Sequence, residues 1–203
     1  MGRKFNKIAP DTPKQLLLGS AIIAVGFDPE TGTLDESDML GSSTGGIRVN
    51  ITPEFADLGS DIDNCPKNTR ELKEITDWSV GTNGTFVTIN SRSAKMLVAA
   101  ADYAGGKITP RMKLKDADFN NLWIIGSYSD SDDAFIAINL KNALNVDGFS
   151  IQTGDRAKGQ FAFNFLAHYT MEKPDEIPFD IYMSEATSAA AAANVEEEEE
   201  ANA

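Results

Sequence analysis

The chain has 203 residues, in which 31 Asp and Glu outnumber 18 Lys and Arg to give a formal net charge of −13. A hydrophobic fraction of 41% is typical of a globular protein, so disorder of the whole chain is excluded. One cysteine, Cys65, and one histidine, His168, exclude an intrachain disulfide and a zinc site built on several of these residues, and the negative charge argues against wrapping nucleic acid, which requires clustered Lys and Arg.

Charge and composition divide the chain into three regions. Residues 1–14 form a basic N-terminal arm, and residues 15–183 are predicted to form a single β domain that is itself acidic. Residues 184–203 form an Ala/Glu-rich low-complexity C-terminal tail, whose run of glutamates repels itself. No secretory signal or apolar run of about 20 residues occurs, so we expect synthesis in the cytoplasm.

The first half of the domain is predicted to contain strands joined by long loops. Apolar residues dominate 15–27, which we predict to be a strand, and the glycine-rich stretch 33–46 is predicted to be a loop. Isoleucine and valine alternate with polar residues over 47–52, which indicates a half-buried strand that Pro53 ends. We expect irregular structure over 53–70.

Residues 78–90 are rich in β-forming side chains, but their turn signal has two interpretations. Thr82-Asn83-Gly84 could form a hairpin turn, since Asn-Gly tolerates positive φ, or a bulge inside one long strand. The Ala-rich stretch 93–103 predicts the one α-helix, with a serine available as N-cap and Gly105-Gly106 closing it.

The second half is predicted to be a series of short strands separated by polar turns. We expect these strands at 107–115, 122–128, 134–140, 148–153, 160–171 and 177–182. The alternation over 160–171 is the strongest β pattern, and the acidic run Asp130–Asp133 is predicted to be a hairpin tip. The fold class is therefore mainly β, a sandwich or barrel with one flanking helix (93–103) and long loops.

Three candidate sites for chemistry have better structural explanations. Asp130-Ser131-Asp132-Asp133 resembles the start of a calcium loop, but Phe135 and Lys141 occupy the positions where that loop requires Gly and a carboxylate. His168 lies in an alternating strand with no motif-marked nucleophile beside it, which favours a hydrogen-bonded structural role. Cys65, in a loop, is interpreted as a small apolar contact.

The remaining motifs point to no catalysis. Gly41–Gly46 lacks the Gly-Lys-Ser/Thr ending of a phosphate loop, and Trp78 and Trp123 are expected in the core or an interface. We predict that the protein is not an enzyme and has no cofactor, no metal and no catalytic or cofactor-binding residues. In an alternative class, a soluble β-sandwich ligand-binding module, Trp78, Trp123 and Tyr128 would form an exposed aromatic platform.

Two stretches resemble a known family. Residues 52–102 contain DNCPKNT and KMLVAAAD, and residues 135–182 contain KGQFAF followed by HY and PFDIY. Together they resemble the major tail protein, the tail tube subunit, of long-tailed bacteriophages of Gram-positive hosts. The similarity in order extends from about residue 15 to residue 183 and does not include the Glu-rich tail.

The resemblance implies a structural virion protein located in the phage tail. Tube subunits self-assemble into hexameric rings that stack into a hollow tube, the conduit for DNA ejection. The implied partners are further copies of the chain, the tape-measure protein, the tail terminator and the distal tail or baseplate proteins. DNA is expected to pass through the lumen without specific binding, and the polar face of the strand 46–52 is a candidate lining. The inner tube of a contractile tail or injection particle is the nearest alternative.

Overall fold

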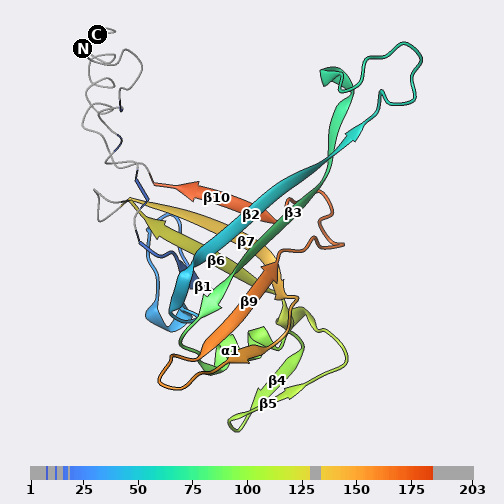
Figure 1. Cartoon of the computed structure of the whole chain (residues 1–203). Coiled ribbons are helices and arrows are strands. Elements are labelled where there is room, and N and C mark those ends of the chain that lie inside the picture. The colour runs from blue at the N-terminus through green and yellow to red at the C-terminus, as the bar shows by residue number, and fades with distance from the viewer. Residues whose placement is uncertain (1–7, 9–11, 13–15, 18, 129–133, 185–203) are drawn as a thin grey trace, which may run out of the picture.

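The computed structural model describes residues 8, 12, 16, 17, 19–128 and 134–184. These residues form a mainly β fold with one flanking α-helix, as predicted (Figure 1). The strands are β1 (Ile22–Ala24), β2 (Ser43–Asp57), β3 (Lys73–Phe86), β4 (Ala101–Ala104), β5 (Lys107–Pro110), β6 (Asn120–Ser127), β7 (Phe135–Asn145), β8 (Ser150–Gln152), β9 (Gln160–Leu166) and β10 (Phe179–Met183). The helix is α1 (Ser91–Leu97), and 3-10 turns occur at Glu36–Asp38, Arg70–Leu72 and Asp116–Asp118.

Eight of the strands form one antiparallel sheet that turns a corner at β7. The order of the strands is β1-β6-β7-β9-β3-β2. In addition, β10 pairs with β7 and β8 pairs with β9. Most of β7 pairs with β6 and β10, whereas its last residues, Leu144 and Asn145, pair with β9. Asn142, just before them, has a φ of 51°. Because a strand that changes sheets needs a local bend, this left-handed residue marks the corner.

The segment between β1 and β2 connects the two ends of the sheet. Its Leu40 amide donates to the Ile23 carbonyl in β1 (3.0 Å), and its Ser42 carbonyl accepts from the Val87 amide next to β3 (2.8 Å). Residues 39–42 therefore lie between β1 and β3 and give the sheet the character of a barrel. The small β4–β5 hairpin forms a separate two-stranded sheet.

The main core fills the space between the two halves of the bent sheet. Phe86 of β3 stacks on Phe163 of β9 at 4.4 Å between ring centroids, and α1 contributes Met96 and Leu97. A second, smaller cluster lies on the other face of β6 and β7. It consists of Trp123, Ile125 and Ala137, with Phe27, Leu34 and Phe135 packed against it.

The helix begins earlier than predicted, because its N-cap is an asparagine. The Asn90 side chain accepts a hydrogen bond from the Ser93 amide (2.8 Å), and the Ser93 hydroxyl accepts one from the Asn90 amide (2.9 Å). This reciprocal pair is a capping box. Ser93 is thus the third residue of the first turn, not the residue before the helix.

The helix also ends earlier, so its prediction over 98–103 was wrong. Ala99 has a φ of 67°, which ends the helical conformation one residue after the C-cap Val98. The chain then enters β4, and Gly105-Gly106 forms the turn of the β4–β5 hairpin instead of closing the helix.

Strands β2 and β3 are longer than predicted. β2 begins at Ser43, inside the predicted loop, and continues through Pro53 to Asp57, so the predicted stop at Pro53 was wrong. β3 passes straight through Thr82-Asn83-Gly84, which excludes the hairpin alternative. The register does shift opposite Gly84, but the extra residues are Gly45 and Gly46 of β2.

Several other predicted strands are present with shorter bounds. The predictions at 15–27, 107–115 and 160–171 correspond to β1, β5 and β9, each of which covers only part of its range. The predicted antiparallel pairing of the strands at 122–128 and 134–140 is confirmed by β6 and β7. The acidic tip Asp130–Asp133, most of the N-terminal arm and residues 185–203 lie outside the described residues.

Candidate assembly surfaces

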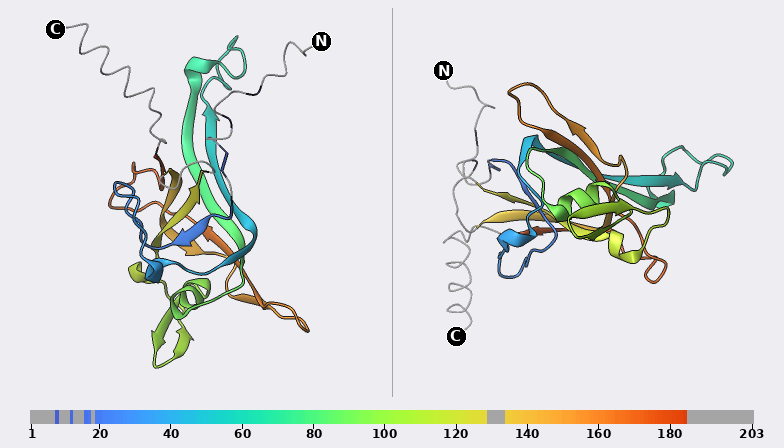
Figure 2. Two further views of the ribbon diagram at one scale, coloured as in Figure 1. Left: turned by 90° about the vertical axis from the view of Figure 1, so that its left-hand side faces the viewer. Right: turned by 90° about the horizontal axis from the view of Figure 1, so that it is seen from below.

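The most prominent surface feature is the outer part of the β2–β3 pair, which projects far from the barrel (Figures 1 and 2). We call residues 53–78 the protruding hairpin. It consists of the end of β2, the connection 58–72 and the start of β3. Nothing else in the described part of the chain packs along its outer half in the views shown.

The apolar face of the sheet continues onto this hairpin. Ile47, Val49 and Ile51 of β2 pack against the main core, and the same alternation places Pro53 and Phe55 on that face further out. Phe55 pairs with Ile75 of β3, and the two side chains are 54% and 46% exposed. The inner face of the sheet therefore extends beyond the core that covers it.

The tip of the protruding hairpin is held in a defined shape by one aspartate. The Asp57 carboxylate accepts hydrogen bonds from the Gly59 amide and the Asn68 amide, both at 3.1 Å. Cys65 lies against Gly59, where an added Cβ would come within 2.9 Å of the thiol sulfur. This contact agrees with the predicted packing role of Cys65. Two more apolar side chains of the connection, Leu58 and Ile62, are exposed.

The opposite end of the molecule is built on the β4–β5 hairpin, and we call residues 101–118 the β4–β5 end (Figures 1 and 2). It too presents apolar side chains to solvent. Tyr103 and Leu114 are about half exposed, and Met112 is fully exposed. Lys107 and Lys113 lie among them, and neither side chain has an ion-pair partner within the described residues.

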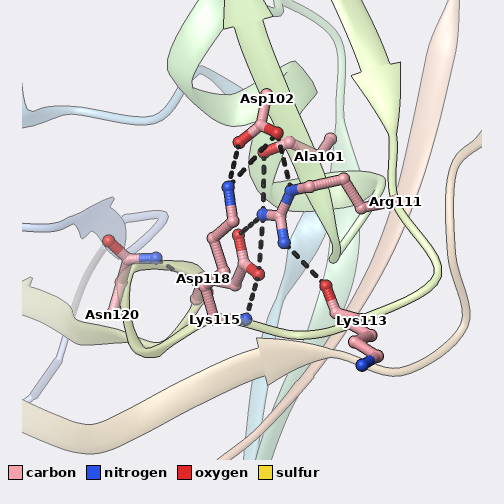
Figure 3. A network of polar contacts seen from close by, with 7 residues as sticks. All are labelled: Ala101, Asp102, Arg111, Lys113, Lys115, Asp118 and Asn120. Carbon is pink, nitrogen blue, oxygen red and sulfur yellow. Dashed lines mark hydrogen bonds and ion pairs between the residues drawn. The ribbon is translucent and has the colours of Figure 1, made fainter.

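A charged network fixes the shape of the β4–β5 end (Figure 3). Arg111 binds both carboxylate oxygens of Asp118, at 2.6 and 2.9 Å, and forms an ion pair with Asp102 at 2.9 Å. It also donates to the Lys113 carbonyl (2.6 Å), while the Lys115 amide donates to Asp118 (2.8 Å). The Asp118 side chain is only 1% exposed, so Arg111 neutralises a buried charge.

Sequence reasoning missed this network, because its members are ordinary surface residue types from different predicted segments: Asp102 in the predicted helix, Arg111 and Lys115 in the predicted strand 107–115, and Asp118 after it. The nearby Asp102 carboxylate is affected as well. A hydrogen bond from Lys115 and the positive charge of Arg111 together lower the pKa of Asp102, although partial burial opposes them. The carboxylate therefore stays ionised across the neutral and mildly acidic range.

Four strands of the sheet, β1, β2, β8 and β10, have one strand neighbour each among the described residues, and β2 and β10 are the longest of them. β10 pairs only with β7, and β2 pairs only with β3. Ile181 and Met183 on β10 are exposed. Unpaired edges with apolar side chains favour pairing with another chain.

The outer face of β2, β3 and β9 is polar and carries little charge. It is the face opposite the core, with side chains exposed or half-buried. Its members, from the alternation and the register, are Arg48, Asn50, Thr52, Ser79, Asn83, Thr85, Gln160, Ala162, Asn164 and Leu166, of which Leu166 is the one large apolar side chain. The alternation predicted for 46–52 is confirmed. Acids join this face further out, where Glu54 of β2 pairs with Asp77 of β3.

His168 lies beside a polar cleft of about 290 Å³ on the other side of the barrel. Its Nδ1 is 3.0 Å from the Asn142 carbonyl, and its ring packs edge-on to Phe119. In the same cleft Lys141 binds Glu176 and Asp180, both at 2.9 Å. The backbone and ring contacts of His168 favour its predicted structural role.

Electrostatics in this cleft are dominated by Lys141. Burial alone would lower the pKa of Lys141, but hydrogen bonds to Asp180 and Glu176 outweigh it and raise that pKa. Conversely, the hydrogen bond from Lys141 and a second from Lys173 lower the pKa of Glu176. The ion pairs tie β7 both to β10, through Asp180, and to the segment that leads into it, through Glu176.

The two tryptophans do not form a shared platform. Trp123 is nearly buried in the outer cluster against Phe27, whereas Trp78 packs against Phe179 at the margin of the main core. They lie on opposite faces of the sheet, and Tyr128 lies next to the end of β6.

Within the described residues, no three His, Cys, Asp or Glu side chains are grouped so as to hold a metal ion. None of the helices in this part of the chain has the length and apolar character needed to cross a bilayer. No protein-family model matches the sequence, and no curated protein matches it either.

Proposed function

We propose that this protein is a structural subunit that self-assembles into stacked hexameric rings, forming the tail tube of a long-tailed bacteriophage. The observation that carries the proposal is the protruding hairpin, whose apolar face leaves its own core at Pro53 and remains uncovered at Phe55 and Ile75. Exposed apolar surface on a projecting strand pair is a liability in a monomer and an assembly device in an oligomer.

Edge strands supply the contacts proposed within a ring. In this arrangement the free edges of β10 and β2 meet those of neighbouring copies, so that the sheet continues from subunit to subunit. Such pairing would cover Ile181 and Met183 and satisfy backbone groups that the described chain leaves unpaired.

The polar outer face of β2, β3 and β9 is the proposed lining of the channel. It presents amides and hydroxyls with Arg48 as its one cation among the members named above. Because DNA is attracted by clustered Lys and Arg, a surface nearly free of them gives the phosphates few points of attachment. Smooth passage of DNA would then depend on the scarcity of cations on this face.

The alternatives differ in what supports them. An inner tube of a contractile tail or injection particle would use the same surfaces. A ligand-binding module has less support, because the aromatic platform that it requires is divided between two faces of the sheet.

Negative-stain electron microscopy of the concentrated protein tests the proposal. We expect hollow tubes or six-fold rings, and persistent monodisperse monomers would contradict it. A double variant, Phe55→Ser with Ile75→Ser, should abolish assembly without changing the circular dichroism spectrum, because both side chains are exposed in the single chain. Met171→Ser, at a fully exposed methionine between β9 and β10, is the control and should assemble normally.

A further inference from the structure

We infer that the protruding hairpin of one copy docks on the β4–β5 end of another copy, head to tail. This inference rests on the proposed function and names the two surfaces that join one ring to the next. The protruding hairpin and the β4–β5 end would then be the two complementary surfaces of one interface that repeats along the tube.

The first argument is their placement. The protruding hairpin and the β4–β5 end lie at opposite extremes of the molecule in two perpendicular views (Figures 1 and 2). A contact between unlike surfaces at opposite ends cannot close within a pair of molecules, because each added copy leaves one free surface of each kind. Heterologous contacts of this type produce open linear assemblies.

The second argument is that each end exposes apolar side chains that the single chain leaves uncovered. On the protruding hairpin these are Phe55, Leu58, Ile62 and Ile75, and on the β4–β5 end they are Tyr103, Met112 and Leu114. Burying both sets against each other removes two exposed apolar surfaces in one contact. Aromatic residues and methionine are the types enriched in the centre of interfaces.

The third argument is charge. The protruding hairpin has more acids than bases: Glu54, Asp57, Asp61, Asp63, Glu71, Glu74 and Asp77 against Lys67, Arg70 and Lys73. Asp61 and Asp63, at its tip, have no ion-pair partner within the described residues. Lys107 and Lys113 at the opposite end are unpaired in the same sense. Opposite charges around an apolar centre fix the register of a contact and select the partner surface.

The fourth argument is that both surfaces are ordered before they meet. Asp57 holds the tip of the protruding hairpin through two backbone amides, and Arg111 with Asp118 holds the β4–β5 end. Little conformational entropy is then lost when the surfaces meet, which favours association.

Cross-linking between two singly substituted proteins tests the inference directly. In a Cys65→Ser background, which removes the only native thiol, one protein carries Ile62→Cys and the other Met112→Cys. After the two are mixed, assembled and treated with a short bismaleimide, we expect a band of doubled mass that neither protein gives alone. The matched control replaces Met112→Cys by Met171→Cys, since Met112 and Met171 are both fully exposed.

The outcomes separate the inference from the proposed function. Tubes that give no Ile62→Cys/Met112→Cys cross-link, or an equal yield with Met171→Cys, overturn the inference and leave the proposed function standing. Absence of any ordered assembly by electron microscopy overturns both.

Charge exchange provides a second, independent measurement. Lys107→Glu with Lys113→Glu should lower the cross-linking yield about tenfold, because like charges then face each other across the contact. When the protein with Lys107→Glu and Lys113→Glu is mixed with a partner protein that carries Asp61→Lys and Asp63→Lys, the cross-linking yield should be restored. A yield that stays at the wild-type level in the first mixture, or that is not restored in the second, would contradict the proposed pairing of the two surfaces.

Discussion

Strands β2 and β3 have two halves with the same pattern and different surroundings. In the inner half, apolar side chains at every second position pack against the main core, and Phe86 is fully buried. In the outer half the alternation continues along β2 to Phe55, and a bulge in β3 between Asp77 and Ile75 brings Ile75 opposite Phe55. Both of these side chains face solvent. A period of two therefore predicts which face of a strand is apolar, but only the rest of the fold decides whether that face is covered within the chain.

The largest expected effect on the free energy of unfolding comes from a substitution in the inner half of β3. Phe86→Ala removes a fully buried ring that stacks on Phe163, so it leaves a cavity in the main core. We expect a loss of about 3–5 kcal/mol in the free energy of unfolding, measured by urea denaturation at a concentration where the protein is monomeric. A loss below about 1 kcal/mol would mean that the core does not depend on this stack.

The next effect concerns the β4–β5 end, which is held by charges instead of apolar cover. Arg111→Ala leaves the buried Asp118 carboxylate without its cation, and we expect a loss of about 3 kcal/mol in the free energy of unfolding. Lys115→Ala is the control, because it removes only the exposed ion pair to Asp102 and keeps the Lys115 backbone hydrogen bond. Equal losses in the two variants would contradict the assigned role of Arg111.

A smaller, pH-dependent effect is expected at Lys141. Because Glu176 has a lowered pKa in the folded protein, its pairing with Lys141 stabilises the fold above the ordinary glutamate pKa of about 4.3 and is lost as the pH falls through the folded value. Lys141→Met should therefore destabilise the protein at neutral pH, and its difference from wild type should shrink in acid. Urea denaturation at several pH values measures this difference, and a constant difference would contradict the assignment.

The raised pKa of Lys141 has the opposite dependence. The contribution of Lys141 to the free energy of unfolding is complete below the ordinary lysine pKa. It is lost as the pH rises through the pKa of Lys141 in the folded protein. Between the acid range in which Glu176 titrates and the alkaline range in which Lys141 titrates, the free energies of unfolding of wild type and Lys141→Met should differ by a nearly constant amount.

The smallest effect on stability is expected in the outer half of the strands. Phe55→Ala removes an exposed ring with Lys73 Nζ lying 4.5 Å from its centroid, so the free energy of unfolding of the monomer should change by about 0.5 kcal/mol or less. Assembly, followed by light scattering at high concentration, should nevertheless be lost. A large loss of monomer stability would show that Phe55 belongs to the core of its own chain.

The sequence predicted the elements that depend on local patterns and missed those that depend on their neighbours. Alternation identified the inner part of β2 and the run that becomes β9, because period two reports a half-buried strand directly. The predicted helix was too long, because the alanines after Leu97 favour a helical conformation. Ala99 instead adopts a left-handed backbone conformation, which an alanine in the sequence does not predict. Neither the corner at β7 nor the pairing of β9 with β3 leaves a local signal.

The candidate surfaces were predictable only in part. The Phe55 position continues the alternation of Ile47, Val49 and Ile51 and could have been assigned to the same face, had Pro53 not been taken as the end of the strand. The Arg111–Asp118 pair joins residues in an irregular segment, and its burial results from packing that sequence spacing does not reveal.

Pro53 has a consequence for any chain that adds to the edge of β2. Its partner Trp78 donates its amide to the Tyr169 hydroxyl, away from β2, so the Pro53–Trp78 pair exchanges no backbone hydrogen bonds and the Pro53 nitrogen faces the free edge. A strand laid along that edge meets a position without a donor. Backbone pairing there is interrupted between residues 43–52 and the outer hairpin, which limits the registers available to an incoming strand and leaves the outer hairpin to bind through its side chains.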